Sequence, residues 1–381
     1  MTKAAELAKM GEVLTNSQIG GRRNIVINGA MQIFQRATSA TAVGSGYTTV
    51  DRFRGDTSTD GAFTTEKSTD NPFGTGNSLK CQVTTADTSL SGTQFSRIIQ
   101  RIEGQDLQQL SYGTSSAKTL ALSFWVKSNK TGIYSILLRK PDNTAYHFIH
   151  EYTISSANTW EQKEIIITPT AGSTSFITAS AGAIDNDNGL GLELSFGLGQ
   201  GSTYAIGTSN TWSSDTNTYA SSNQVNWMDS TSNNFYLTQV QLEVGSQATP
   251  FEHRSFGEEQ RLCQRYAIVY SKNGQPNMGQ KAIGTGASTN NSGAYQAFIF
   301  PQVTMRAVPT LTVGGSVSDY EILKYETGYV DVNSSISLFS ASGRSLFVLT
   351  FSSATAEAER GRDVIMRLEG DNSSLLFDSE L

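Results

Sequence analysis

Short runs of residues that alternate between apolar and polar side chains recur along most of this sequence, and this period of two constrains the fold most. Successive side chains of a β-strand point to opposite faces, so a strand with one buried face shows this alternation. Turn-forming clusters separate the runs, and no long helical pattern intervenes, which predicts an antiparallel sandwich rather than a parallel α/β sheet. The candidate strands of this first series are residues 24–27, 48–54, 63–67, 78–83, 94–102, 119–127, 133–139, 145–152, 164–168, 190–196 and 235–244.

A second series of candidate strands follows a change of pattern near residues 254–257. Thr249, Pro250 and Phe251 end the first series, and residues 257–266 show a charged helical pattern. The later runs are enough for a small sandwich of their own. These runs are residues 265–270, 294–300, 310–313, 320–324, 329–333, 346–351 and 363–368. We therefore predict an all-β chain with a larger sandwich over residues 24–255 and a smaller C-terminal β-sandwich over residues 256–381.

Residues 1–23 differ from both series. Helix-forming residues fill residues 4–9, and Ala4, Leu7, Gly11 and Leu14 recur at spacings of three and four. This spacing predicts a short amphipathic helix, which would need a partner surface to be stable. A hinge at Gly20 and Gly21 would follow it. The segment is either a frayed terminus or a docking and assembly element.

Composition supports the β prediction and excludes several functional classes. Ser and Thr contribute 89 of the 381 residues, whereas the charged residues make up only 16%. This argues against a helical bundle, a coiled-coil rod and a charge-driven disordered protein. The net charge of -6 gives no basic footprint for nucleic acid. The sequence also has no apolar run of membrane-spanning or signal-peptide length. We therefore expect a soluble protein made in a cytoplasm, without membrane insertion.

Groups that could carry catalysis or bind a metal or cofactor are scattered rather than clustered. Cys81 and Cys263 are the only cysteines, so a disulfide framework and a cysteine metal site are excluded. His147 and His150 lie three apart in a predicted strand, where they would point to opposite faces instead of sharing a metal. Glu151, Glu164, Glu193 and Asp215 are carboxylates whose spacing selects no glycosidase pair.

Two short motifs resemble ligand-binding loops without completing them. In residues 185–189, Asp185 and Asp187 begin like a calcium loop, but Gly189 comes one position early. An Asx-rich turn is the favoured interpretation, and calcium bound with the help of a neighbouring loop is the alternative. Gly197, Gly199 and Gly201 begin like a dinucleotide loop that lacks its third glycine and its βαβ context. We therefore expect no catalytic residues, no metal and no cofactor.

The polar stretch of residues 199–232 carries four large aromatic side chains. Aromatic faces can cover the apolar faces of sugar rings while Asn and Ser bind the hydroxyl groups, so this composition suits a glycan-binding loop. In the alternative interpretation, which we favour over binding, the rings hold a long loop against the sandwich or in a subunit interface. The candidate glycan-binding residues are Tyr204, Trp212, Tyr219 and Trp227.

Several strings in the sequence resemble a widespread group of tailed-phage virion proteins. Those near the start resemble the opening of that group, and those in the middle resemble the segment that joins its jelly roll to a distal β domain. The last string is similar to termini of cyanophage fibre-like proteins. In chain order, the strings are NIVINGAM (24–31), FQR (34–36), VDRF (50–53), FYLTQVQLEVG (235–245), ATPFE (248–252), LCQRY (262–266) and FDSEL (377–381). The chain departs from the pattern at Gln260 and Ala267, where Leu and an aromatic residue are expected.

The resemblance implies a homotrimeric tail fibre or receptor-binding protein with a jelly roll similar to that of carbohydrate-binding modules. Its expected place is the virion, on the phage tail or particle surface, after synthesis in the bacterial host cytoplasm. Residues 1–23 would attach it to other tail or virion proteins, and exposed loops would meet host cell-surface glycan. It would not be an enzyme. A head or tail decoration protein without a receptor role is one alternative, and a glycan depolymerase is the other.

Overall fold

The computed structural model describes residues 23–272, 281–289, 293–324, 328–353, 361 and 363–381. The chain forms two compact units, which divide between residues 259 and 260, with Leu381 grouped with the first. The predicted boundary lies at residue 255. The helix expected within residues 1–23 falls outside the described residues. No described helix is long and apolar enough to cross a membrane.

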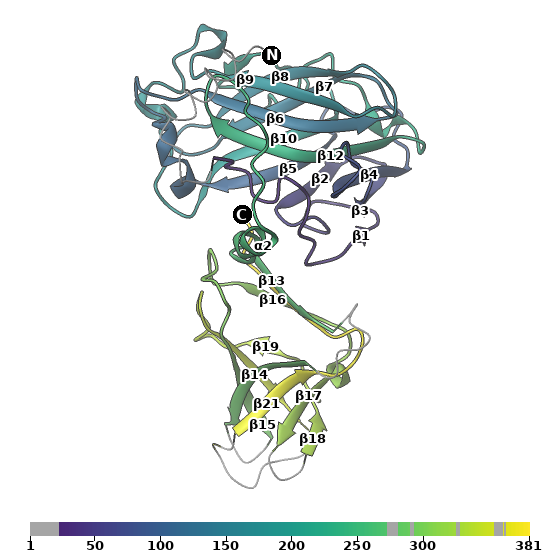
Figure 1. Cartoon of the computed structure of the whole chain (residues 1–381), viewed down its shortest axis with the longest axis vertical. Coiled ribbons are helices and arrows are strands. Elements are labelled where there is room, and N and C mark those ends of the chain that lie inside the picture. The colour runs from purple at the N-terminus through teal and green to yellow at the C-terminus, as the bar shows by residue number, and fades with distance from the viewer. Residues whose placement is uncertain (1–22, 273–280, 290–292, 325–327, 354–360, 362) are drawn as a thin grey trace. The chain divides into compact units, whose positions relative to one another are not determined.

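The first unit is a jelly-roll sandwich of two six-stranded antiparallel sheets (Figure 1). Sheet A has the order β1-β3-β4-β12-β6-β9, and sheet B has the order β11-β8-β7-β10-β5-β2. Short 3-10 turns η1 to η4 connect them at Gly104–Leu110, Ala171–Ser173, Ser180–Gly182 and Trp227–Asp229. The strands of sheet A are Ser39–Ala40, Ala62–Ser68, Ser78–Thr85, Asn234–Val244, Leu120–Ser128 and Glu161–Ile167, and those of sheet B are Thr211–Ser213, Tyr146–Ile154, Gly132–Lys140, Leu190–Gln200, Phe95–Glu103 and Phe53–Ser58.

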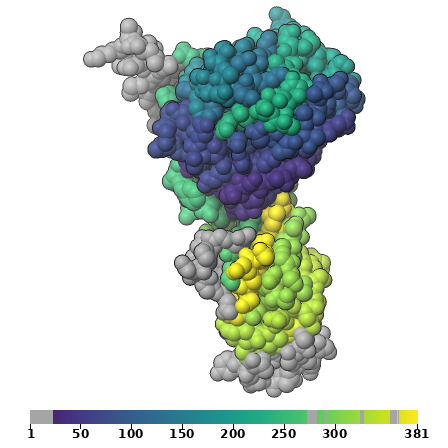
Figure 2. All heavy atoms as spheres, turned by 90° about the vertical axis from the view of Figure 1, so that its right-hand side faces the viewer, coloured from purple at the N-terminus to yellow at the C-terminus, as the bar shows by residue number. Residues whose placement is uncertain are grey.

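Alternation along the strands places one continuous apolar core between the two sheets. Phe124 and Leu194 are fully buried there, and the ring of Phe124 meets those of Tyr152 and Phe196 edge to face. Cys81 is buried in the same core and forms no disulfide. In Figure 2, segments far apart in sequence lie side by side on the surface of this unit, as expected for antiparallel pairing between distant strands.

Strand β12 is irregular in the way its sequence indicates. Phe235 and Leu237 are on the opposite alternation from Val240 and Leu242, which predicts either a strand covered on both faces or a bulge. The structure contains the bulge: the pairing with β6 shifts register between Thr238 and Gln241. Gln239, at this bulge, has a φ of 49°. All four apolar residues therefore reach the core.

Residues 24–29 contain no strand, although their pattern predicts one over residues 24–27. They follow the distal half of β12, where β4 no longer pairs with it. The side chain of Asn24 accepts the amide of Leu242 at 3.1 Å and donates to the carbonyl of Val240 at 3.0 Å. Val240 in turn donates its amide to the carbonyl of Gly29 at 2.9 Å. A side-chain amide thus replaces part of the usual ladder, and this explains why the segment is irregular.

The second unit contains a three-stranded sheet and a seven-stranded sheet around a separate apolar core. The helix α2, Phe256–Gln264, confirms the helix that the charged pattern of residues 257–266 indicates. The three-stranded sheet has β13 (Ala267–Ser271), β22 (Ser374–Asp378) and β16 (Thr310–Gly314). The larger sheet runs through β18 (Gly328–Asp331), β17 (Tyr320–Lys324), β21 (Asp363–Leu368), β14 (Lys281–Ser288), β15 (Ala294–Ile299), β20 (Phe347–Ser352) and β19 (Ser337–Leu338), with the turn η5 at Val317–Asp319.

We expect Gly29→Ala to destabilise the jelly roll by about 2 to 4 kcal/mol. A Cβ at this position would lie 2.1 Å from the carbonyl oxygen of Val240, so the segment would have to move away from β12. Gly44→Ala is the matched control, because a Cβ there meets nothing within 4 Å. All four tryptophans lie between residues 125 and 227, so the change in tryptophan fluorescence during urea unfolding reports on this unit. Equal midpoints for the two variants would contradict the prediction.

Candidate glycan-binding groove

Two of the four aromatic residues predicted to bind glycan lie inside the core. Trp212 is 1% exposed and Trp227 is 0% exposed. Trp212 belongs to β11, which pairs with β8 opposite Phe148, and its indole nitrogen donates to the carbonyl of Thr168 at 2.9 Å. The prediction that these two rings contact a ligand is therefore wrong, because short secondary structure within the polar stretch turns them inward.

The other two predicted residues, Tyr204 and Tyr219, are half-buried above the outer face of sheet B. Their rings stack at 4.5 Å between centroids, and the guanidinium of Arg97 lies 4.5 Å from the centroid of Tyr219. Arg97 is itself buried and ion-paired with Asp56. These contacts hold the segment of residues 201–226, which includes β11, against the sheet, as the alternative interpretation of the aromatic residues proposed.

The histidine pair and the calcium-like loop show no ligand geometry. His147 is 1% exposed, and its Nδ1 lies 2.8 Å from the carbonyl oxygen of Thr218; burial lowers its pKa to about 4. The carboxylate of Asp187 accepts the amide of Gly189 at 2.8 Å, which is an Asx turn. Asp185 accepts from the side chain of Asn143. The described residues contain no group of three or more His, Cys, Asp or Glu that could hold a metal.

A groove of about 560 Å³ lies on the outer face of sheet A. Its floor comes from Ser123 and Trp125 on β6, beside Gln162 on β9 and the bulged Gln239 on β12. Its walls come from the loop that joins β3 to β4 and from the chain after β12. The residues that line it are Phe73, Thr75, Ser123, Trp125, Gln162, Gln239, Pro250, Phe251 and His253.

Aromatic rings form the apolar part of this groove. Phe73 is 52% exposed, and its ring meets that of Trp125 edge to face at 5.4 Å. An Asx turn fixes the loop, because the amide of Phe73 donates to Asn71 Oδ1 at 2.9 Å. On the facing wall, the rings of Phe251 and His253 lie 5.1 Å apart. Exposed, preformed aromatic faces of this kind suit a ligand with flat apolar surfaces.

Polar side chains in the groove are available to a ligand. No hydrogen bond to another described residue involves the side chains of Gln162, Gln239, Thr75 or Ser123. Gln239 lies in the groove because of the bulge, which interrupts the alternation of β12. The groove therefore combines aromatic faces with unused hydrogen-bonding groups, which is the combination that holds a sugar.

Sequence reasoning missed this groove, although β6 carries a signal for it. Ser123, Trp125 and Lys127 share the face opposite Leu122, Phe124 and Val126, so a tryptophan interrupts an otherwise polar face. Whether that face is covered depends on segments more than 30 residues away in the sequence, such as Phe73 and Phe251. The alternation alone could not decide this.

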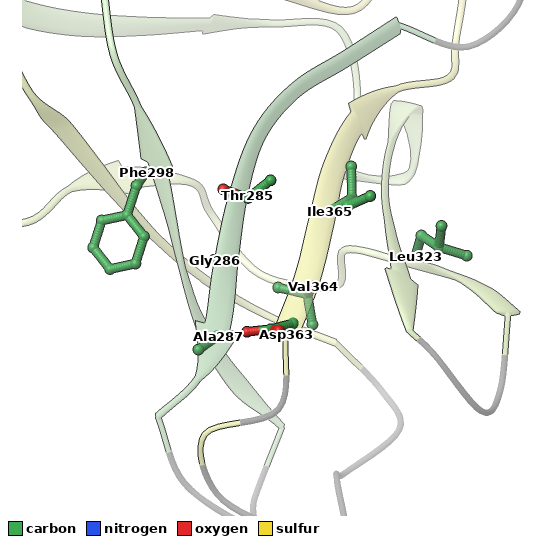
Figure 3. A pocket seen from close by; sticks show the side chains of 8 residues that line it. All are labelled: Thr285, Gly286, Ala287, Phe298, Leu323, Asp363, Val364 and Ile365. Atoms are coloured by element: carbon green, nitrogen blue, oxygen red, sulfur yellow. The ribbon is translucent and has the colours of Figure 1, made fainter.

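A second hollow, of about 580 Å³, lies on the outer face of the larger sheet in the C-terminal unit (Figure 3). Its apolar side chains come from four strands and are those of Ala287, Phe298, Leu323, Val364 and Ile365. Among the described residues that line it, two have polar side chains, Thr285 and Asp363. Because so few polar groups would orient a sugar, we favour the groove on sheet A as the candidate site.

Comparisons with known proteins place no family name on the chain. No family profile matches it, and no curated protein matches its sequence. Among solved structures, it is similar to the enzymatically active domain of tailspike protein 4 from bacteriophage CBA120, with 13% identity and a TM-score of 0.30, covering 58% of this chain and 21% of that one.

Two further structural likenesses are equally distant. A family 11 carbohydrate-binding module from Clostridium thermocellum shows 12% identity and a TM-score of 0.29, covering 56% of this chain and 99% of the module. An arabinose-bound α-L-arabinofuranosidase shows 9% identity and a TM-score of 0.31, covering 60% of this chain and 28% of the enzyme. At these scores the likenesses carry no argument about function, and the fold assignment stands on the sheet topology of the chain itself.

Proposed function

We propose that this chain is a structural phage virion protein, a tail fibre or tail-associated receptor-binding protein, whose jelly roll binds host cell-surface glycan in the groove on sheet A. One observation carries the glycan-binding part of the proposal. The groove presents Phe73, Trp125 and Phe251 together with polar side chains that have no partners among the described residues. A sugar needs both, because its ring faces are apolar and its edge carries hydroxyl groups.

The virion part of the proposal rests on the sequence strings described above. Asn24 and Gly29, in the first string, contact Leu242 and Val240 in the later one. The strings therefore correspond to a structural junction in the jelly roll, and two of them also contribute Gln239, Pro250 and Phe251 to the lining of the groove. On the same resemblance we propose a homotrimer, attachment to other tail or virion proteins through residues 1–23, and a location on the phage tail or particle surface.

We propose binding without catalysis. Glycoside hydrolysis uses two carboxyl groups that flank the scissile bond at a fixed separation. Among the residues that the structure describes, those lining the groove include neither Asp nor Glu. Ligand binding in this groove is thus supported by its composition, whereas a depolymerase acting there would lack its acid and its nucleophile or base.

Trp125→Ala is expected to weaken binding of host envelope polysaccharide at least about tenfold, which corresponds to about 1.4 kcal/mol. The ring supplies the floor of the groove and is only half-buried, so its removal should change the free energy of unfolding little. Trp212→Ala is the matched control, because it removes a tryptophan from the core and should cost about 3 to 5 kcal/mol of stability. Calorimetric titration of purified polysaccharide and thermal melting separate the two effects. Unchanged binding by a stable Trp125→Ala protein would exclude the groove.

The purified chain is expected to have a mass near three times 41.1 kDa in solution. Closed symmetry multiplies weak surface contacts, and fibre-like proteins gain stability by burying subunit faces. Multi-angle light scattering at micromolar concentration measures this directly. A mass of 41.1 kDa would contradict the trimer without affecting the glycan-binding proposal.

A further inference from the structure

A second pair of aromatic rings lies beyond the groove along the strands of sheet A. Tyr236 on β12 pairs with Lys127 on β6, two positions beyond Trp125, and its ring lies 6.0 Å from that of Trp160. Residues two apart on a strand share a face and are separated by roughly 7 Å along it. The face thus carries two aromatic platforms in sequence, Phe73 with Trp125 and then Tyr236 with Trp160.

The second platform is held rigidly before any ligand arrives. The indole nitrogen of Trp160 donates to Asp70 Oδ1 at 2.9 Å. The ammonium of Lys127 pairs with the same carboxylate and lies 4.3 Å from the ring centroid of Tyr236 and 5.2 Å from that of Trp160. Rings fixed in this way lose little conformational entropy on binding, so each can contribute to affinity.

Charges around the two platforms disfavour an acidic ligand. No Lys or Arg is among the described residues that line the groove. The nearby cations are already paired, Lys127 with Asp70 and Lys80 with Glu66. Glu164 on β9 lies opposite Ser123, is exposed, and forms no ion pair with another described residue. An anionic sugar would meet this carboxylate without a compensating cation, which selects against it.

We infer that the ligand is an uncharged glycan chain, bound through consecutive sugar units that lie along β6 and β12. This inference rests on the proposed glycan-binding function. A single terminal sugar would occupy only the groove and leave the Trp160 platform unused. A chain would contact both platforms, with Gln239 and Gln162 placed to bind hydroxyl groups of the unit over Trp125.

The test is a calorimetric titration of the full chain with uncharged cello-, manno- and laminari-oligosaccharides of one to six units, and with oligogalacturonates of matched length. We expect the affinity for at least one uncharged series to rise at least tenfold between one and four units, and the oligogalacturonates to bind at least tenfold more weakly. Trp160→Ala should flatten the dependence on length, and Trp160→Phe should restore part of it. Glu164→Gln should raise the affinity for the oligogalacturonates.

The outcomes separate this inference from the proposed function. An affinity that does not depend on length, or tighter binding of the oligogalacturonates, would overturn the inference while leaving glycan binding in place. Binding that Trp125→Ala leaves intact would overturn the proposed groove. Absence of binding to every uncharged and acidic probe would overturn both. Thermal melting of each variant, monitored by circular dichroism, shows that the loss of affinity does not come from unfolding.

Discussion

The jelly roll depends on how residues 24–29 bind to the distal half of β12. β4 pairs with β12 only through residue 237, so the peptide groups beyond it need other partners. The side chain of Asn24, the backbone amide of Ile25 and the backbone carbonyl of Gly29 supply partners for Val240 and Leu242. Buried peptide groups without partners would each cost about 1 to 3 kcal/mol, so this short segment has a large effect. The close approach of this segment to β12 also explains the glycine at position 29, where a Cβ would clash with the carbonyl oxygen of Val240.

Polar side chains extend this contact across the outside of β12. Glu243, which is 2% exposed, accepts the amide of Thr249 at 2.8 Å and forms an ion pair with Arg23 at 3.2 Å. Glu252 accepts the amides of Arg23 and Asn24 at 3.0 and 2.9 Å. The chain after β12 is therefore held against the strand, and this is the segment that carries Phe251 to the wall of the groove. The groove thus depends on the same junction as the fold.

The bulge at Gln239 connects the core to the proposed site. Without it, either Phe235 and Leu237 or Val240 and Leu242 would face outward, and Gln239 would follow the regular alternation. With it, all four apolar residues are buried and Gln239 faces the groove. A positive φ is unfavourable for a residue other than glycine. The packing of the apolar residues on both sides of the bulge holds Gln239 in this backbone conformation. One irregular residue therefore allows all four apolar side chains to be buried and places a hydrogen-bonding group in the site.

The sequence by itself determined the all-β class and most of the strands, because these follow from the alternation of neighbouring side chains. For β12 it left two possibilities, a strand covered on both faces or a bulge, and the structure decided for the bulge. The sequence did not reveal β14, where Gly286 lacks a side chain to mark the pattern and a Cβ would lie 1.7 Å from the carbonyl oxygen of Gln296. Only the tertiary structure decided which aromatic residues are exposed. Trp212 and Trp227 lie in a polar stretch yet are buried, whereas Trp125 lies in a regular strand and faces a groove. Local alternation fixes the face to which a side chain points, but segments distant in sequence determine whether that face is covered.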